Sequence, residues 1–376
     1  MRLGPWAALV VAAALAVACR SGDGGPLVSD NSRTTPGPTT TAAPTPSPTP
    51  TAPPAPPPIA SLADVFPPRD LPLASLDPGR LRVLVATGDV IPARMVDVVI
   101  RRRGDDFLYP VRDVAALTRA ADVTVVNLEA PLIEDCPYHD RGFTFCGRPG
   151  FVQALLALGV DVATLENNHI GNYGQGGIAE TQERLARAGI AWADRHRLAV
   201  LDVRGLRFGF LAFNGVGESF DRGAIAQAIA NARRQVDVLV VAFHWGMEYV
   251  DVPQPAPGIA PDDPVEIGHL AVEAGADLVL GNHPHWVQAV EVYRGKLIVY
   301  AHGNFIFDQM WSYETRVGVI GRYTFYDRHL VRVEFLPVLI EDYARPRPLE
   351  GQEGQAVLER MRRASESLAQ RVAARP

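Results

Sequence analysis

The stretch GNHPHW, residues 281–286, holds two histidines on either side of a proline, directly after the apolar run ADLVL. Proline restricts its own backbone and that of the residue before it, so one rigid turn presents both imidazoles. Two imidazoles presented together suit a divalent metal ion, although a plain polar loop would also explain them. Residues elsewhere in the chain must decide between these interpretations.

Residues of metal-binding type also follow other apolar, β-branched runs. In chain order they are Asp89, Glu129, the pair Asn168 and His169, and His244, ahead of His283 and His285. Sites in open α/β sheets form beyond the carboxyl ends of the strands, so these side chains are expected to meet. Each has an ordinary explanation on its own: Asp89 could cap a helix, and Glu129 could pair with an arginine. Their recurrence at five strand ends favours a metal centre.

Carboxylate, amide and imidazole groups together suit borderline divalent ions such as Zn²⁺, Mn²⁺ or Fe²⁺. A carboxylate that bridges two metals about 3.5–4 Å apart helps to activate water and to clamp a phosphoryl oxygen. A histidine outside the ligand set would then protonate the leaving group. The pattern therefore predicts two divalent ions and hydrolytic chemistry.

Side chains next to the candidate ligands could contact a substrate or support the ligands. Arg94, soon after the first candidate, offers a guanidinium that can bind an anion bidentately. Trp245 and Trp286 each follow a candidate histidine, where they either wall the pocket or pack, and packing is the favoured interpretation. Glu248 and Tyr249 are expected to hydrogen-bond to the ligands.

Buried strands are the elements that must position these residues. The predicted strands are residues 81–89, 122–129, 160–169, 236–246 and 276–285. Their continuous hydrophobicity, without strict alternation, indicates that both faces are covered, which predicts α/β layering. Further elements are helices at 177–188 and 264–274, a hairpin at 198–214, strands at 296–307 and 329–340, and an arginine-rich amphipathic helix at 354–374.

The N-terminal part of the chain is not expected to be globular. Residues 1–19 resemble a secretory signal whose apolar stretch is too short to span a bilayer comfortably. Its end, LAVAC, predicts lipidation of Cys19; cleavage at an ordinary small-residue site and an uncleaved anchor are the alternatives. Residues 20–80 are expected to be a disordered linker rich in proline and threonine, of which residues 36–58 could reach roughly 70 Å as polyproline II.

The remaining residues divide into a globular domain, 81–345, and a C-terminal helical segment, 346–376. The whole chain carries a net charge of −6 and has no basic block, which argues against a nucleic-acid partner. Cys136 and Cys146 lie ten residues apart in one loop. A disulfide is favoured over zinc binding, because no second cysteine pair completes a four-ligand site.

Six motifs in this order resemble the capsule-synthesis protein CapA (PgsA) family: GDVIPAR, NLEAPL, NNHIGNYG, HWGMEY, GNHPHWVQ and YAHGNFIFDQ. The resemblance covers about residues 81–339. It implies a calcineurin-like metallophosphatase fold, an α/β/β/α sandwich, and a role in poly-γ-glutamate biosynthesis. It also implies that His169 is the general acid and that the metal ligands are Asp89, Glu129 as the bridging carboxylate, Asn168, His244, His283 and His285. Arg94, Asn127, Trp245 and His302 complete the site as candidate substrate-binding residues.

The chain departs from the family pattern at four positions. Ile91 stands where metallophosphatases carry a histidine, two residues after the first aspartate. Asn172 replaces an acidic residue, Glu166 stands where alanine is usual, and His302 replaces an apolar residue. These changes bear on how many metals bind and on whether the site turns a substrate over.

We expect an extracytoplasmic protein, anchored to the outer face of the membrane as a lipoprotein or secreted. Its expected role is the synthesis, export or attachment of an anionic envelope polymer, alongside membrane-bound capsule-synthesis proteins. One alternative is a non-catalytic subunit that binds the polymer. A second is a secreted metal-dependent phosphodiesterase unrelated to capsule.

Overall fold

A computed structural model describes residue 37 and residues 54–374. Cys19, the signal sequence and most of the proline- and threonine-rich tract therefore lie outside the described residues. Within the described residues, no helix combines the length and the hydropathy that crossing a bilayer requires.

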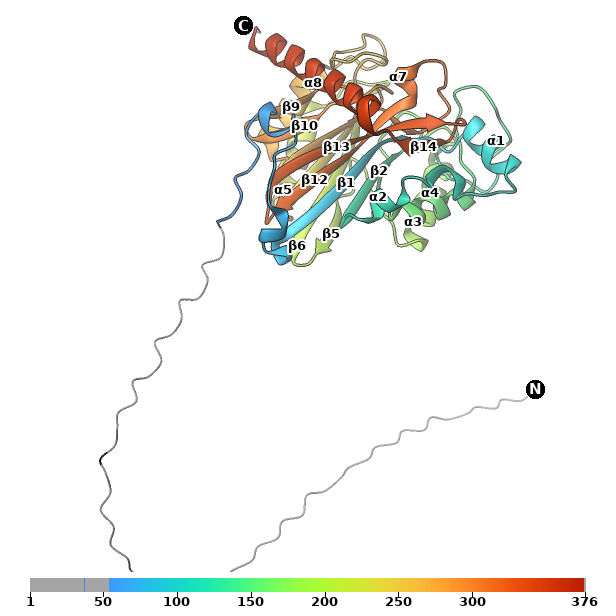
Figure 1. The fold of residues 1–376 in the computed structure, drawn as a ribbon. Coiled ribbons are helices and arrows are strands. Elements are labelled where there is room, and N and C mark those ends of the chain that lie inside the picture. The colour runs from blue at the N-terminus through green and yellow to red at the C-terminus, as the bar shows by residue number, and fades with distance from the viewer. Residues whose placement is uncertain (1–36, 38–53, 375–376) are drawn as a thin grey trace, which may run out of the picture. The chain divides into compact units, whose positions relative to one another are not determined.

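Two β-sheets packed face to face form the centre of the fold (Figure 1). The first sheet has the strand order β14-β13-β12-β1-β2-β3-β4, with β11 beside β1, and the second has the order β5-β6-β7-β8-β10-β9. The strands of the first sheet are β1 (Leu81–Val90), β2 (Val123–Leu128), β3 (Val162–Thr164), β4 (Ala191–Ala193), β11 (Asn304–Ile306), β12 (Val317–Tyr326), β13 (His329–Glu341) and β14 (Arg345–Pro348). Those of the second are β5 (Ala199–Val203), β6 (Leu206–Asn214), β7 (Val238–His244), β8 (Leu278–Asn282), β9 (Val290–Tyr293) and β10 (Lys296–Val299).

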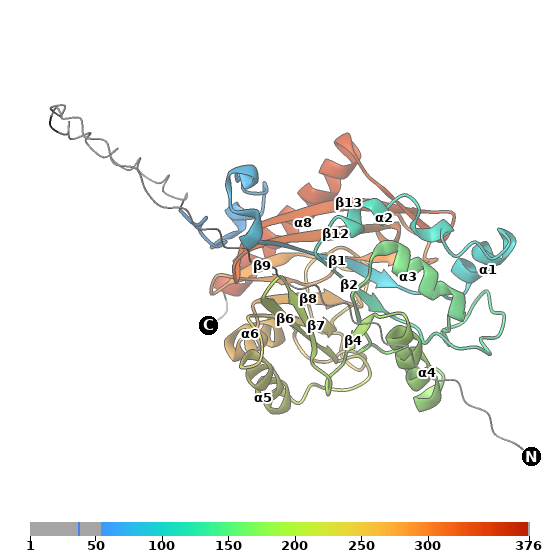
Figure 2. The same ribbon diagram turned by 90° about the horizontal axis from the view of Figure 1, so that it is seen from below.

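Helices cover the outer faces of both sheets, as Figure 2 shows for α3 on one side and α5 and α6 on the other. The helices are α1 (Met95–Arg102), α2 (Ala115–Arg119), α3 (Val152–Leu158), α4 (Gly174–Arg187), α5 (Arg222–Arg233), α6 (Pro264–Ala274), α7 (Tyr313–Arg316) and α8 (Gly351–Ala373). Val99 of α1 and Leu155 of α3 pack on the first sheet, whereas Ile229 of α5 and Ile267 of α6 pack on the second. The predicted α/β/β/α sandwich is confirmed.

The space between the sheets is filled by side chains from both inner faces. Leu84 of β1, Val240 of β7 and Leu278 of β8 belong to this core. The rings of Phe208 and Phe325, from opposite sheets, meet edge to face with centroids 5.5 Å apart. The runs predicted as strands lack alternation because each strand packs against the other sheet on one face and against helices on the other.

Two predicted strands differ from the structure. The run at 160–169 forms only a three-residue strand, β3, because the polar residues after Thr164 turn into the loop that carries the candidate ligand. The run at 296–307 forms two strands in different sheets, β10 and β11. Gly303 lies between them with φ of +73°, a conformation that glycine adopts at little cost, and there the chain crosses from one sheet to the other.

The boundary that we expected at residue 81 lies too far along the chain. Ile59 and Val65 are each 1% exposed and join the core between the sheets, so residues 59–80 belong to the domain and not to a linker. The backbone N–H of Ile59 donates to the carbonyl of Leu330 at 2.9 Å, and the ring of Phe66 stacks on that of Phe335. Widely spaced apolar residues among prolines gave too weak a periodic signal to reveal this packing.

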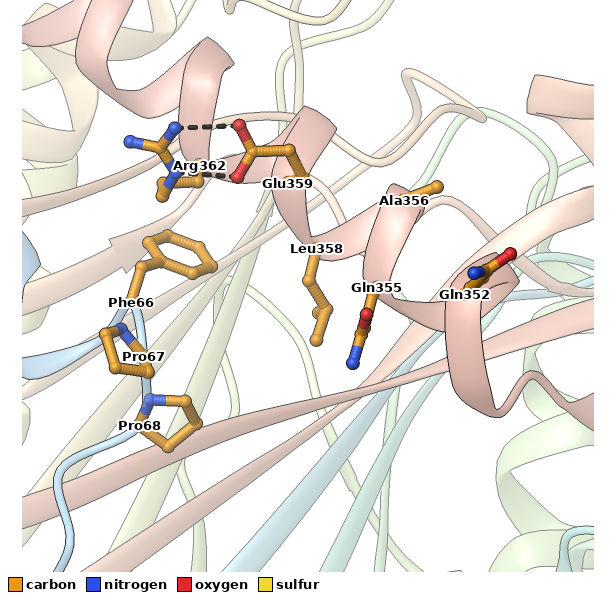
Figure 3. Close-up of a pocket in the computed structure, with 9 residues that line it drawn as sticks. All are labelled: Phe66, Pro67, Pro68, Gln352, Gln355, Ala356, Leu358, Glu359 and Arg362. Carbon is orange, nitrogen blue, oxygen red and sulfur yellow. Dashed lines mark hydrogen bonds and ion pairs between the residues drawn. The ribbon is translucent and has the colours of Figure 1, made fainter.

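Helix α8 confirms the predicted amphipathic helix. Val357, Met361 and Leu368 are buried against the sheets, whereas its arginines are half-buried or exposed. Figure 3 shows a pocket of about 620 Å³ between this helix and the segment Phe66–Pro68, beside the ion pair of Arg362 and Glu359. None of the residues lining this pocket is a candidate site residue, so it is distinct from the site below.

Candidate metal centre

The candidate ligands meet where the two sheets end together. The parallel strands β1, β2 and β3 of the first sheet carry three of them at or just after their carboxyl ends, and β7 and β8 of the second sheet carry the other three. From the first sheet come Asp89, Glu129 and Asn168, and from the second come His244, His283 and His285. Residues that follow successive strands along the sequence thus meet at a single edge of the sandwich.

Asp89 and Glu129 are joined through one amide. The Nδ2 of Asn127 donates to Oδ1 of Asp89 at 2.8 Å and to Oε2 of Glu129 at 3.3 Å. Asn127 is itself held by Asn167, whose Nδ2 donates to Oδ1 of Asn127 at 3.1 Å. Both carboxylates are at most 1% exposed. Asn127, proposed as a substrate-binding residue, therefore orients the two carboxylates from within the protein.

Gly88 allows Asp89 to reach this position. A Cβ on Gly88 would lie 2.0 Å from the carbonyl oxygen of Gly303, so only glycine lets β1 and the crossover to β11 approach so closely. The backbone N–H of Asp89 donates to that same carbonyl at 3.0 Å. The close approach of the Gly303 carbonyl therefore explains why the motif GDVIPAR begins with glycine.

His244 is bonded to Asn168, across the two sheets. Its Nε2 lies 2.8 Å from Oδ1 of Asn168 and 3.4 Å from Oε1 of Glu129. Asn167, the residue before Asn168, uses Oδ1 to accept from two backbone N–H groups of the following turn, which fixes the loop. Asn167 therefore has a structural role, while Asn168 contacts the candidate ligand His244.

The turn at His283 and His285 has left-handed backbone at both histidines, with φ of +94° and +56°. Side chains other than glycine adopt such values rarely and at a cost, often where a site requires it. The Nδ1 of His285 donates to Oδ1 of Asn304 at 2.9 Å and lies 3.1 Å from Oδ2 of Asp89. Nε2 of His283 lies 3.8 Å from Oε1 of Glu248.

The donor atoms form two compact groups. In one, the ligand atoms of Glu248, His283 and His285 lie within 4.8 Å of one another, and in the other those of Asp89, Glu129 and His244 do. The contact between His285 and Asp89 joins the two groups. Each group mixes carboxylate and imidazole donors, the types that borderline divalent ions take, so both are candidate metal-binding groups.

Burial and mutual proximity shift the pKa values in opposite directions. Burial raises the pKa of Glu129 well above its ordinary value, and the charge of Asp89 adds to this. Burial alone would raise the pKa of Asp89 and lower that of His285. Their mutual hydrogen bond outweighs it, so the pKa of Asp89 falls and that of His285 rises to about 9. Burial lowers the pKa of His244 to about 3 and that of His283 well below its ordinary value.

His169 lies beside the cluster and is held on two sides. Its Nδ1 lies 3.0 Å from Oδ1 of Asn172, which therefore accepts, and its ring is tilted against that of Phe145 with centroids 4.1 Å apart. Burial lowers its pKa to about 4, opposed by the bond to Asn172 and assisted by the charges of His244 and His285. Phe145 adjoins Cys146, whose sulfur is bonded to that of Cys136, as we expected.

Arg94 is engaged with protein groups and not with the ligands. Its guanidinium forms an ion pair with Asp308, donates to the carbonyl of Gly142 at 3.2 Å, and lies 4.9 Å from the ring centroids of Phe145 and Phe307. It thus joins the disulfide loop to the loop after β11. An anion would have to compete with Asp308 for it.

Trp245 and His302, two of the candidate substrate-binding residues, contact the core of the sandwich. Trp245 is 1% exposed and packs between Phe243 and Tyr300, donating through Nε1 to the carbonyl of Tyr300, in keeping with the packing interpretation. Nε2 of His302 lies 2.7 Å from the hydroxyl of Tyr323, on a strand of the first sheet. These contacts are with core residues of the sandwich.

Two residues near the centre have roles that the sequence did not predict. Glu248 was expected only to support the ligands, but its carboxylate groups with His283 and His285. Asn304 was not singled out, yet it accepts from His285 and donates to Oε1 of Gln309 and to the carbonyl of Thr315. Its place in the motif YAHGNFIFDQ, directly after a glycine, was the available signal.

The fold and the clustered donors define a two-sheet α/β protein with a candidate metal centre at the shared edge of its sheets. The family model described as bacterial capsule synthesis protein PGA_cap matches residues 83–309, and the chain belongs to this family. The resemblance seen in the six motifs is thereby confirmed.

Relatives of known name agree with the family. PGA biosynthesis protein CapA of Bacillus subtilis (strain 168) is 28% identical over 286 residues, which cover 70% of this chain and 72% of that protein. Capsule biosynthesis protein CapA of Bacillus anthracis is 27% identical over 297 residues, 71% of this chain and 69% of that protein. A crystal structure of a hypothetical protein from Thermus thermophilus aligns with a TM-score of 0.44 and 14% identity, over 68% of this chain and 98% of that chain.

Proposed function

We propose that this chain is a cell-surface protein that uses a site with two divalent ions in the synthesis, export or attachment of an anionic envelope polymer of poly-γ-glutamate type. Membership of the capsule synthesis family supports the role in capsule formation. The names of the two Bacillus relatives, which refer to capsule or PGA biosynthesis, support the choice of polymer. The reaction class that we infer is hydrolysis of a phosphoester or of a polyglutamate amide.

The observation that carries this proposal is that both ring nitrogens of the buried His283 lack hydrogen-bond partners among the described residues. The residue is only 1% exposed. An imidazole buried in this state costs free energy unless another group takes up its lone pair. A divalent ion held with His285 and Glu248 would do so, and Mn²⁺, Fe²⁺ or Zn²⁺ suits the donors.

Two bound ions would supply Lewis acidity and lower the pKa of water. The chain's own residues have the remaining tasks. Asn127 orients the two carboxylates, and Asn304 orients His285 through Nδ1. Because Nδ1 of His169 donates to Asn172, Nε2 is the atom that is free to exchange a proton with a leaving group.

The proposed location rests on the sequence before residue 54. A signal-like stretch ending at Cys19 and the proline- and threonine-rich tract after it support lipid anchoring on the outer face of the membrane. Membrane-bound capsule-synthesis proteins would then be its partners. Mass spectrometry of the mature N-terminus tests this: a diacylglyceryl modification on Cys19 is expected, and an unmodified terminus beyond Cys19 would contradict it.

Elemental analysis of the purified chain tests the metal centre. We expect roughly two equivalents of Mn, Fe or Zn, at least halved by His283→Ala because one donor group is lost. His329→Ala is the matched control, since His329 is exposed on β13 and distant in sequence from every candidate ligand. Its metal content should equal that of the unsubstituted chain.

Activity separates hydrolysis from simple polymer binding. The metal-loaded chain should cleave a phosphodiester or γ-linked glutamate oligomers, and His169→Ala should lower kcat by about 10²–10⁴-fold without loss of metal. A metal-free chain whose stability is unchanged by His283→Ala would sink the enzymatic proposal and leave the polymer-binding subunit.

A further inference from the structure

A cleft of about 610 Å³ adjoins the candidate centre at Asn168, at the same edge of the sandwich. Asn168, a candidate ligand after β3, lines it at one end. Two further strand ends supply part of its walls: Asp194 and Arg195 follow β4 of the first sheet, and Asn214 ends β6 of the second. Helix α4 supplies another part. A substrate that reaches from the candidate ligands past Asn168 would therefore enter this cleft.

Arg195 is the only arginine among the residues that line the cleft. Its side chain contacts two carboxylates that differ in solvent exposure and in the number of contacts they make to it. Its backbone N–H and Nε donate to the two oxygens of Glu166, at 3.2 and 2.9 Å, and Nη2 lies 2.8 Å from Oε2 of that residue. The same Nη2 donates to Oε1 of Glu218 at 2.8 Å. The side chain of Glu166 is 13% exposed, whereas that of Glu218 is 53% exposed.

The two carboxylates have different roles for this reason. Two guanidinium contacts to a largely buried carboxylate, which the backbone N–H of Arg195 also binds, fix the guanidinium in place, so Glu166 acts as its anchor. A single contact from a half-exposed side chain contributes little, so Glu218 can leave at small cost. A carboxylate arriving from solvent would take the same place on Nη2 without changing the local charge.

From this arrangement we propose that Arg195 recognises a carboxylate of the substrate, and that Glu218 occupies the place of that carboxylate until the substrate arrives. The inference rests on the proposed function and adds a specificity-determining residue to it. Gln175 and Gln182 line the same cleft and offer amide donors and acceptors, which match the amide bonds between the units of such a polymer. The ligand class is an oligomer that bears a carboxylate on each amide-linked unit.

Binding of γ-linked hexaglutamate to the full chain, measured by calorimetry, tests the proposal. Glu218→Gln should tighten binding by about three- to tenfold, because the internal competitor loses its charge. Arg195→Gln should weaken it at least about tenfold, and Arg195→Lys should weaken it as well, since an ammonium cannot keep the forked contacts. Glu218 is half-exposed, so its substitution leaves the fold intact and keeps the test decisive if Arg195 variants are unstable.

Two controls isolate the contact. Arg197→Gln removes a neighbouring guanidinium, which lies 4.1 Å from the ring of Trp192 and outside the residues that line the cleft, and should leave affinity unchanged. A hexamer whose α-carboxylates are converted to amides should bind every variant with the same low affinity.

The outcomes also separate this inference from the proposed function. If the unsubstituted chain and the Glu218→Gln and Arg195→Gln variants all bind hexaglutamate with the same affinity, the proposed role of Arg195 is overturned. This holds even if metal is present. A chain without metal that still shows tighter binding with Glu218→Gln overturns the hydrolase proposal and retains the carboxylate site.

Discussion

The side-chain oxygen of Asn172 accepts hydrogen bonds from His169 and from the backbone of the disulfide loop at the same time. Nδ1 of His169 lies 3.0 Å from it and the N–H of Phe145 lies 2.6 Å from it. One amide thus decides which ring nitrogen of His169 carries the proton and ties that ring to residues 136–146. An aspartate at this position could accept both bonds as well, but would bring a charge next to the imidazole.

Asn172→Ala should release the ring of His169. We expect a mixture of tautomers in ¹⁵N-detected histidine spectra, where the unsubstituted chain shows the proton on Nδ1, and a kcat lower by about 10–100-fold with metal content unchanged. Asn172→Asp is the matched control, because it keeps both acceptor contacts. A single unchanged tautomer in Asn172→Ala would show that other contacts fix the ring.

Loss of the disulfide should cost stability and loosen the same histidine. The bond between Cys136 and Cys146 closes a short loop, with a sequence separation of 10, for which chain entropy predicts about 2–3 kcal/mol. Urea unfolding of the Cys136→Ser, Cys146→Ser double variant measures this loss. Reductant should lower the stability of the unsubstituted chain to the same value and leave the double variant unaffected. Equal stability of the two proteins without reductant would count against the prediction.

Gly88→Ala should destabilise the chain severely, by about 3 kcal/mol or more. The added Cβ would lie 2.0 Å from a backbone carbonyl that cannot move without shifting the crossover between the sheets. Gly176→Ala serves as the control, since a Cβ there meets nothing within 4 Å and the position is helical, so stability should hold or rise by about 0.5 kcal/mol. Thermal unfolding compares both, and equal melting temperatures for the two variants would refute the explanation.

The stability of the chain should fall in acid through Asp122. Burial alone would raise the pKa of Asp122. Hydrogen bonds from Arg204 and from the N–H of Val83, together with the nearby arginine charges, outweigh burial, so the pKa lies below its ordinary value of 3.8. Stability from a depressed carboxyl pKa is present above the unfolded pKa and is lost as the pH falls through the folded pKa. Asp122→Asn should therefore cost about 1–3 kcal/mol at about pH 7.

Chemical denaturation at several pH values measures this difference. The gap between Asp122→Asn and the unsubstituted chain should be constant from about pH 7 down to about pH 5 and should narrow below about pH 4, where the carboxylate is protonated. A gap that is independent of pH down to about pH 2 would mean that packing, and not charge, accounts for the loss.

The sequence predicted the buried strands and their polar ends well, because continuous apolar runs followed by ligand-type residues are a strong local signal. Asp89, Glu129 and His244 lie where that signal ends. What the sequence could not supply was the pairing of strands. That β10 and β11 belong to different sheets depends on the conformation of Gly303, and no apolar run encodes that.

Side-chain direction was the second limit. Arg94, Trp245 and His302 are of the right type and lie near candidate ligands in sequence, but their contacts are with Asp308, Tyr300 and Tyr323. Conversely, the carboxylate of Glu248 lies with His283 and His285 among the donors, next to a residue, Tyr249, whose φ of +61° the sequence does not signal. Such placements follow from tertiary contacts that residue type and spacing do not determine.

Each sheet supplies three of the six predicted ligands, and the layer of side chains between the sheets sets the gap that separates them. The spacing of the candidate ligands therefore depends on core residues between the sheets near the ligand-bearing strand ends, such as Ala86 of β1 and Ala242 of β7. In the proposed metal centre, a change of volume in that layer would alter the distances between donors, and divalent ions differ by tenths of an ångström in the donor distances that they accept. The choice of ion at the proposed centre would then be encoded partly in the hydrophobic core and not only in the ligands.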